Sequence, residues 1–290
     1  MSDIKIGIIG GSGLYQMKGM QVLEEREVET PYGRPSDKVI IGQIGDRKVA
    51  FIPRHGRGHI FNPTNVPVRA NIWALRSLGV FWTLAVSAVG SLRKEMAPRD
   101  FVIPDQIIDR TRHRPDTFFD DLAVHVGFSY PFHPALRRLL LEACWQQEGL
   151  KTHDGGTYVC MEGPLFSTKA ESEMHRSWGA SLIGMTALPE AKLAREAEMC
   201  YAAIGLVTDY DVWHEEDHVN VASVMENVKA NTEHVQEVLR RVIPLIPIGK
   251  EEDCDAFHAL RGAVMTRPDL ISQDTWARVG LFLEKYFQRS

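Results

Sequence analysis

The sequence has few cysteines, no long apolar run and no large excess of charge of one sign. The four cysteines make no Cys-x-x-Cys pair, so neither a zinc ribbon nor a disulfide framework is indicated. No apolar run approaches the roughly 20 residues of a membrane-spanning helix. With 33 lysines and arginines against 38 aspartates and glutamates, no basic block indicates a nucleic-acid surface. We therefore expect neither a nucleic-acid nor a membrane partner.

The amino terminus also lacks the features of an export signal. Its first residues, MSDIKIGIIGG, contain no basic n-region, no h-region and no small-residue cleavage site. The 290 residues are 44% hydrophobic and 24% charged, which is typical of a globular protein that is long enough for a sizeable core. The composition predicts a cytoplasmic protein, and we expect it to be an enzyme.

Short β-rich runs alternate with helical patterns along most of the chain. The runs 38–44 and 48–52 flank Gly45-Asp46, which predicts a hairpin. Residues 65–78 have helical spacing, with Pro67 in the first turn and Gly79 after the end. The run 102–108 reads as one more strand. This alternation predicts an α/β fold in a single domain.

The pattern changes after Lys250. Residues 255–265 have helical spacing, and Ser272 is placed to cap a final helix. Trp276, Val279 and Leu283 share one side of that helix. The helix either packs on its own subunit or docks on a neighbouring one, and the sequence leaves both open.

Glycines follow the first predicted strand directly. Gly10-Gly11-Ser12-Gly13 comes after the apolar run 4–9, and backbone N–H groups with the Ser12 hydroxyl can hold a phosphate there. Gln16 stands where a dinucleotide-binding motif has its third glycine, which argues against an NAD-dependent dehydrogenase. A tight turn without a ligand is the alternative.

A basic stretch follows a later apolar strand. Arg54 offers a planar fork that fits phosphate, and His55 adds a donor. His55 and His59 are four residues apart, but the glycines between them argue against a helix that would align them on a metal. An anion site is the favoured interpretation over a solvated loop. The small and hydroxyl residues 87–92 also end a strand, where ligands of α/β sheets collect; a simple turn is the alternative.

Two carboxylates follow the predicted strand 201–208. In an extended segment Asp209 and Asp211 point the same way, so that one can carry a proton while the other accepts hydrogen bonds. A structural Asx-turn is the alternative. The following run 215–218 indicates a solvated loop rather than a metal site.

These stretches belong to a larger ordered set of motifs. The set consists of Ile6–Leu14, Arg54–Gly56, Ala70–Leu75, Asp105–Arg110, Glu162–Ser167, Met185–Thr186, Pro189–Glu196 and Thr208–Trp213. On these motifs the sequence resembles the S-methyl-5'-thioadenosine phosphorylases, the trimeric branch of the purine nucleoside phosphorylases. The resemblance extends over residues 4–245.

The resemblance implies an activity and an architecture. The activity is a pentosyl transfer: reversible phosphorolysis of S-methyl-5'-thioadenosine to adenine and 5-methylthioribose 1-phosphate, in methionine and purine salvage. Phosphate is a co-substrate, with no metal and no organic cofactor, and the assembly is a homotrimer. The fold is one three-layer α/β domain with a central mixed, partly barrel-like sheet flanked by helices. Residues 1–250 form the nucleoside phosphorylase domain, and 251–290 form its C-terminal helical extension.

The resemblance also implies roles for single residues. Phosphate would be held by Ser12, Arg54, His55, Ser87, Ala88 and Thr186. The purine and ribose would be flanked by Phe166 and Met185, with Ser167 beside the base. The positions around the methylthio group would be His125, Val221 and Val224.

The two aspartates would act on the base. Asp209 would assist protonation at purine N7, and Asp211 would orient it and recognise the 6-amino group. Cleavage of the glycosidic bond puts positive charge on the ribosyl ring and negative charge on the base. The phosphate would stabilise the positive charge, and a carboxylic acid would neutralise the negative charge by protonating the base. For Asp209 to donate, its pKa must be raised, and burial beside Asp211 would raise it.

The sequence departs from the family pattern in three places. Gly184 stands where adenine-type enzymes have asparagine, Ser87 replaces a common threonine, and the tail after residue 265 is longer. Gly184 favours a phosphorylase of S-methyl-5'-thioinosine or another 6-oxopurine nucleoside, whereas Asp209 opposes it. A nucleoside hydrolase and a non-catalytic purine- or phosphate-binding module are further alternatives.

Overall fold

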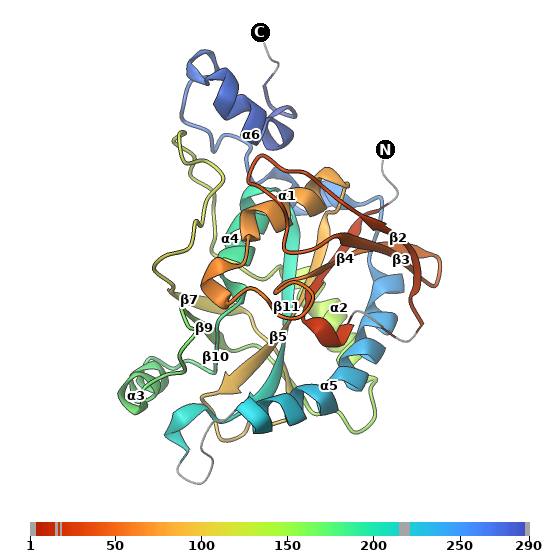
Figure 1. Cartoon of the computed structure of the whole chain (residues 1–290), viewed down its shortest axis with the longest axis vertical. Helices are drawn as coiled ribbons and strands as arrows, with labels where there is room; N and C mark the ends of the chain where they lie inside the picture. The colour runs from red at the N-terminus through yellow and green to blue at the C-terminus, as the bar shows by residue number, and fades with distance from the viewer. Residues whose placement is uncertain (1–3, 15–16, 18, 215–220, 288–290) are drawn as a thin grey trace.

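The computed structural model describes residues 4–14, 17, 19–214 and 221–287, except for the side chain of Ser12. Within these residues one mixed sheet of 11 strands forms the centre of the molecule (Figure 1). Its strands are β1 (Ile6–Gly10), β2 (Gln21–Arg26), β3 (Val39–Ile44), β4 (Arg47–Pro53), β5 (Trp82–Ser91), β6 (Phe101–Ile103), β7 (Gln106–Arg110), β8 (Thr152–Asp154), β9 (Thr157–Met161), β10 (Leu182–Gly184) and β11 (Cys200–Asp209).

The sheet branches at β5. Its main path runs β2-β3-β4-β1-β5-β10-β9-β7, and β11 leaves this path from β5 toward β6 and β8. β1 runs parallel to β5 as far as the pair Ile9–Ala85. β10 runs antiparallel to the end of β5, at Gly90 and Ser91. β11 pairs with the other side of β5. On the side that β1 and β10 share, no described strand pairs with residues 86–89, which lie between the two pairings. The sheet is open there.

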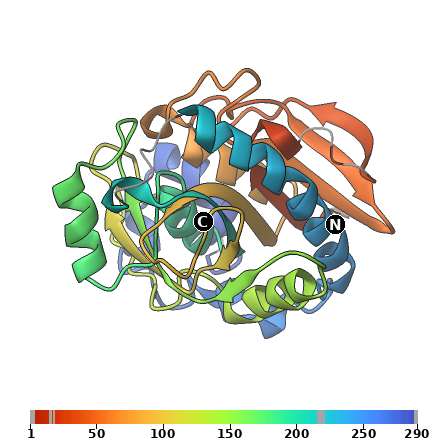
Figure 2. The ribbon, with the colours of Figure 1, turned by 90° about the horizontal axis from the view of Figure 1, so that it is seen from below.

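Helices cover both faces of this sheet. They are α1 (Val68–Ser77), α2 (Pro134–Trp145), α3 (Lys169–Ser177), α4 (Ala187–Glu196), α5 (Val221–Val242) and α6 (Gln273–Leu283). α1, α4 and α6 share one buried cluster with the sheet, whereas α2 and α5 share a second one. α3 lies at the edge of the molecule, far from β2 and β3 (Figures 1 and 2). The predicted α/β fold, with a central mixed sheet flanked by helices, is confirmed.

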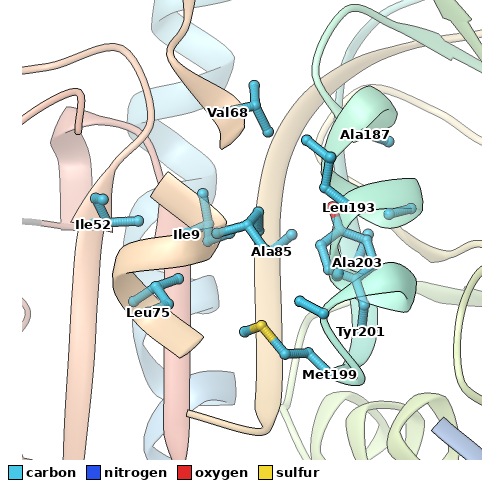
Figure 3. Close-up of a cluster of buried hydrophobic side chains, with 14 of the residues drawn as sticks. Ile9, Ile52, Val68, Leu75, Ala85, Ala187, Leu193, Met199, Tyr201 and Ala203 are labelled. Atoms are coloured by element: carbon cyan, nitrogen blue, oxygen red, sulfur yellow. The ribbon is translucent and has the colours of Figure 1, made fainter. Parts of the chain in front are cut away.

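The first of these clusters joins α1, the sheet and α4. Figure 3 shows Val68 and Leu75 of α1 facing Ile9 and Ala85 of the sheet, with Leu193 of α4 nearby. All five are buried, and burial of a large aliphatic side chain contributes roughly 1.5–3 kcal/mol each. This packing fixes β1, β5 and α4 relative to one another, and their ends carry polar groups that the sequence singled out.

The structure also corrects some predicted elements. Residues 102–108 form two strands, β6 and β7, because Pro104 lacks the N–H that a continuous ladder needs. β2 and β8 were not predicted. The prediction of a helix over 255–265 is wrong: the segment has one 3-10 turn, Asp255–His258, followed by turns.

The final helix begins as predicted. The Ser272 hydroxyl accepts a hydrogen bond from the backbone N–H of Thr275. Phe282 of α6 packs on Phe118 with ring centroids 4.7 Å apart, so the helix packs on its own chain. The division at residue 250 stays a prediction. No helix within the described residues has the length and apolar character needed to cross a lipid bilayer.

Candidate active site

A pocket of about 350 Å³ lies where the sheet is open. Residues 86–90 of β5 form its floor, and α5 lines one wall with Val224, Met225 and Val228. The ends of β4 and β11 and the junction between β10 and α4 complete it. Four of the stretches singled out in the sequence therefore meet in one cavity.

Most of the predicted phosphate-binding residues lie at this pocket. Arg54, His55, Ser87, Ala88 and Thr186 all line it, as do Gly11 and Gly13. The Ser87 and Thr186 hydroxyls are 2.8 Å apart and share a hydrogen bond. Ala88 is exposed within an otherwise buried strand, so its backbone is accessible from the pocket. The side chain of Ser12 and the run 215–218 lie outside what the structure describes.

Arg54 is held by a buried ion pair that the sequence did not predict. Its Nε and one terminal nitrogen donate to the two carboxylate oxygens of Glu190 at 2.5 and 3.1 Å. The other terminal nitrogen donates to the Val86 carbonyl at 2.7 Å. Each terminal nitrogen carries two hydrogens, so one on each remains for an anion. Burial disfavours the charge, but Glu190 raises the pKa of Arg54 above its usual value.

His55 is an acceptor at its free nitrogen, not the donor that the sequence predicted. Its Nδ1 lies 2.9 Å from the Phe61 carbonyl, which can only accept a hydrogen bond. The ring stacks on His59 with centroids 4.2 Å apart. Burial, helped by the charge of Arg54, lowers the pKa of His55 to about 4. At neutral pH the ring is therefore uncharged, and Nε2 is free to accept the proton of a hydrogen phosphate.

Asp209 and Asp211 both line the pocket, but the segment between them is a turn and not extended. Asp209 Oδ1 accepts the N–H of Asp211 at 2.8 Å, which makes an Asx-turn. Its Oδ2 accepts the hydroxyl of Thr208 at 2.7 Å. Asp211 has a φ of 50°, in the left-handed region. The local turn thus aims two carboxyl groups into one cavity.

Burial favours the protonated form of both carboxyl groups. It raises the pKa of Asp209, and the charge of Asp211 adds to the effect. Burial also raises the pKa of Asp211. Asp211 Oδ2 is buried, without a hydrogen-bond partner among the described residues. A Cβ on Gly90 would lie 2.9 Å from Asp209 Oδ1, so a glycine in β5 makes room for this carboxyl group.

The remaining predicted residues divide into two groups. Phe166, Met185 and Val224 line the pocket. Those that do not line it are Ser167, Val221 and His125. Ser167 is buried and donates to the Met161 sulfur, while Val221 is exposed at the start of α5.

His125 lies on the exposed surface of the chain. Its backbone N–H donates to Ala263 in the C-terminal segment, outside the pocket of its own chain. The neighbours Val124 and Val264 form an isolated β-bridge. The loop that carries His125 is therefore tied to the residues after 250.

Gly184 has a structural partner that the sequence did not reveal. A Cβ at this position would lie 2.0 Å from the hydroxyl oxygen of Tyr158. Tyr158 is fully buried, and its hydroxyl has no hydrogen-bond partner among the described residues. The tyrosine hydroxyl therefore fills the space of a side chain at position 184, which lines the pocket.

The geometry agrees with the comparison against protein families. The model that matches is the phosphorylase superfamily, over residues 5–244. This chain belongs to the phosphorylase superfamily. The motifs at the pocket, from the glycines after β1 to the aspartates after β11, lie within the matched residues.

Similar proteins within this superfamily carry one description. A Chloroflexus aurantiacus S-methyl-5'-thioadenosine phosphorylase is 51% identical over 99% of this chain and 100% of its own length. A Prochlorococcus marinus protein of the same description is 48% identical, over 99% of this chain and 92% of its own. The resemblance predicted from the motifs is confirmed.

Solved structures agree. A methylthioadenosine phosphorylase from an antarctic soil metagenomic library superposes with a TM-score of 0.92, at 43% identity over 98% of this chain and all of its own. The Schistosoma mansoni methylthioadenosine phosphorylase in complex with adenine has a TM-score of 0.84 at 34% identity, over 92% of this chain and 100% of its own.

Glu190→Gln tests the buried ion pair. The substitution keeps the shape of the side chain but leaves the Arg54 charge unpaired, so we expect it to lower the free energy of unfolding by about 3–5 kcal/mol. Urea denaturation without phosphate measures the loss. Glu173→Gln is the control, because its pair with Arg176 is exposed and is worth less than about 1 kcal/mol. Equal losses in the two variants would contradict the role of Glu190.

Gly184→Ala tests the contact with Tyr158. The added methyl group collides with a buried hydroxyl, so we expect a loss of stability of about 1–3 kcal/mol or more. In the double variant with Tyr158→Leu the two losses should not add, which a double-mutant cycle measures by denaturation. Gly127→Ala, where a Cβ meets nothing within 4 Å, is the control. Additive losses would show that the two positions act independently.

Proposed function

We propose that this chain is a pentosyltransferase that cleaves S-methyl-5'-thioadenosine with phosphate, giving adenine and 5-methylthioribose 1-phosphate in a reversible reaction of methionine and purine salvage. One observation carries the proposal: a single pocket holds the oxyanion-binding groups of Arg54, Ser87 and Thr186 together with the buried carboxyl group of Asp209. The family and the described relatives support it.

The phosphate end of the pocket prepares the nucleophile. The two remaining N–H groups of Arg54 and the hydroxyls of Ser87 and Thr186 bind the phosphate oxygens. The uncharged His55 accepts the phosphate O–H, which favours the more nucleophilic dianion. A phosphate oxygen then forms a bond to C1′ of the ribose as the C1′–N9 bond breaks. The positive charge that develops on the ribosyl ring is stabilised by the dianion beside it.

The aspartates act at the leaving group. The electron pair of the broken bond passes to the purine, and Asp209 gives its proton to N7, so that neutral adenine leaves. A buried acid with a raised pKa is suited to this donation. Asp211, which also lines the pocket, accepts a hydrogen bond from the 6-amino group. An oxygen at position 6 would face this acceptor with no hydrogen to offer, which favours adenine.

The apolar wall of α5 suits the methylthio end of the substrate. Val224, Met225 and Val228 line the pocket there, and Phe166 and Met185 line the part assigned to purine and ribose. An apolar pocket rejects an added hydroxyl by only about 10²-fold. Some cleavage of adenosine is therefore expected.

One observation favours a second candidate, cleavage of S-methyl-5'-thioinosine or another 6-oxopurine nucleoside. The Tyr158 hydroxyl occupies the space of a side chain at Gly184, so no amide group can reach the base from that position. The hydroxyl is buried and Tyr158 does not line the pocket, so no side chain from this position recognises a 6-amino group.

The assembly and location belong to the same proposal. We propose a cytoplasmic homotrimer that works with phosphate as co-substrate and without a metal or organic cofactor in the reaction. Because His125 lies outside the pocket of its own chain, it contacts a substrate only if a neighbouring copy supplies it. Ser167 and Val221 do not line the pocket, so they would influence substrate specificity only by positioning residues that do.

Free-base release tests the function directly. We expect adenine from S-methyl-5'-thioadenosine only when phosphate is present, and little hypoxanthine from S-methyl-5'-thioinosine under the same conditions. Chromatography of the products, with and without phosphate, measures both. Preferential hypoxanthine release would establish the second candidate. Release of the free base at the same rate without phosphate would show that the reaction is hydrolysis and not phosphorolysis.

Asp209→Asn tests the acid. We expect turnover to fall by roughly two to four orders of magnitude, the usual contribution of general acid catalysis, and the preference to relax toward 6-oxopurines. In the unaltered enzyme turnover falls as pH rises through the raised pKa of Asp209, because only the protonated form donates. The variant should lack this limb of the pH profile. The exposed Asp46→Asn is the control, and an unchanged limb in Asp209→Asn would remove this residue from its role.

A further inference from the structure

A second group of chemically reactive side chains lies away from the pocket. A ring nitrogen of His133, Cys200 Sγ and Cys254 Sγ all lie within 4.8 Å of one another. His133 is the N-cap residue of α2, Cys200 begins β11, and Cys254 lies in the segment after residue 250. The spacing of the cysteines in the sequence gives no hint of this cluster, because the fold joins three distant segments.

A carboxylate completes the set. Asp255 Oδ1 lies 3.1 Å from His133 Nε2 and 4.0 Å from Cys254 Sγ. Cys254 Sγ is itself 3.1 Å from the same nitrogen. The other carboxylate oxygen of Asp255 accepts from Arg195 at 3.0 Å, which fixes the orientation of the carboxylate. Three side chains thus bring ligand atoms within 4.8 Å of one another, and the Asp255 carboxylate lies next to two of them, His133 and Cys254.

The polar atoms of this cluster share few well-placed hydrogens. Nε2 carries at most one hydrogen, and both Cys254 Sγ and Asp255 Oδ1 lie at hydrogen-bond distance from it. The Cys254 thiol can donate to Asp255 Oδ1 only over a long 4.0 Å. A cation would bind the imidazole nitrogen and both sulfur atoms at once.

We propose that His133, Cys200, Cys254 and Asp255 bind one thiophilic divalent cation, with Zn²⁺ as the natural occupant. Two thiolates, an imidazole and a carboxylate are ligands that zinc takes in tetrahedral sites. With Zn–S near 2.3 Å and Zn–N near 2.0 Å, a tetrahedral ion places its sulfur and nitrogen ligands roughly 3.6 Å apart. Small shifts of the side chains bring the present separations to that value. Each thiol loses its proton to solvent as its sulfur binds the ion.

The surroundings suit a structural ion with an entry path. Cys200 and Cys254 are buried, while the Asp255 side chain is 61% exposed. A small pocket lined by Tyr130, His133 and Cys200 opens beside them. An ion enters past the carboxylate and is then held by sulfur.

The cluster is separate from the active site. Cys200 begins β11 and Asp209 ends it, and at about 3.3 Å per residue this strand places them about 30 Å apart. The ion therefore takes no part in the cleavage of the nucleoside. The ion ties the segment after residue 250 to α2 and to the sheet. This structural role is separate from the proposed activity.

Metal binding by the full-length protein tests the proposal. The untagged protein is purified under reducing conditions, stripped with a chelator and titrated with Zn²⁺, and bound zinc is counted by elemental analysis. We expect one zinc per chain and a higher melting temperature with zinc than without. With Co²⁺ in its place, a sulfur-to-cobalt charge-transfer band in the near ultraviolet reports thiolate ligands without any substitution of the protein.

Matched variants separate this site from other thiols. Cys254→Ser and Cys200→Ser should each weaken Zn²⁺ binding at least 10²-fold and abolish the charge-transfer band. Cys144→Ser removes a buried cysteine of α2 outside the cluster and should bind zinc as the unaltered protein does. The proposal is overturned by substoichiometric zinc in the reduced protein, or by equal losses in Cys144→Ser. A Cys200–Cys254 disulfide that persists after reductive purification, seen as a mass loss of two hydrogens, also overturns it.

Discussion

The central strand β5 changes its partner part-way along its length, and the pocket depends on this change. β1 stops opposite Ala85, and β10 pairs with β5 only at Gly90 and Ser91, so the backbone between these two pairings is released from one side of the ladder. Backbone groups released in this way are free to meet a ligand. The same opening lets α5 approach from one side and the junction of β10 and α4 from the other.

The electrostatics of the pocket follow from burial. An arginine charge remains there because Glu190 pairs with it, whereas the nearby His55 loses its charge for lack of such a partner. The carboxyl groups at the opposite wall are pushed toward their protonated forms. Desolvation acts on all of these groups, and the neighbour of each decides which protonation state results.

The local part of the architecture was predictable from the sequence. The hairpin of β3 and β4, helix α1 with its proline entry and the cap of α6 at Ser272 are set by turn chemistry and periodicity within a few residues. The segment 255–265 was not, because its helical spacing belongs to turns that contact the loop around His125. Tertiary contacts there outweigh a weak local preference.

By itself, the sequence determined which stretches end strands of an α/β sheet and offer groups suited to binding phosphate and holding a proton, because strand and turn preferences act locally. Only the tertiary structure decided which distant residues meet. Glu190 reaches Arg54, the Tyr158 hydroxyl takes the space beside Gly184, and Cys254 comes to Cys200 and His133. The residues that these contacts join lie 26 to 136 positions apart in the sequence. The packing of whole elements sets such distances, and no spacing in the sequence encodes them.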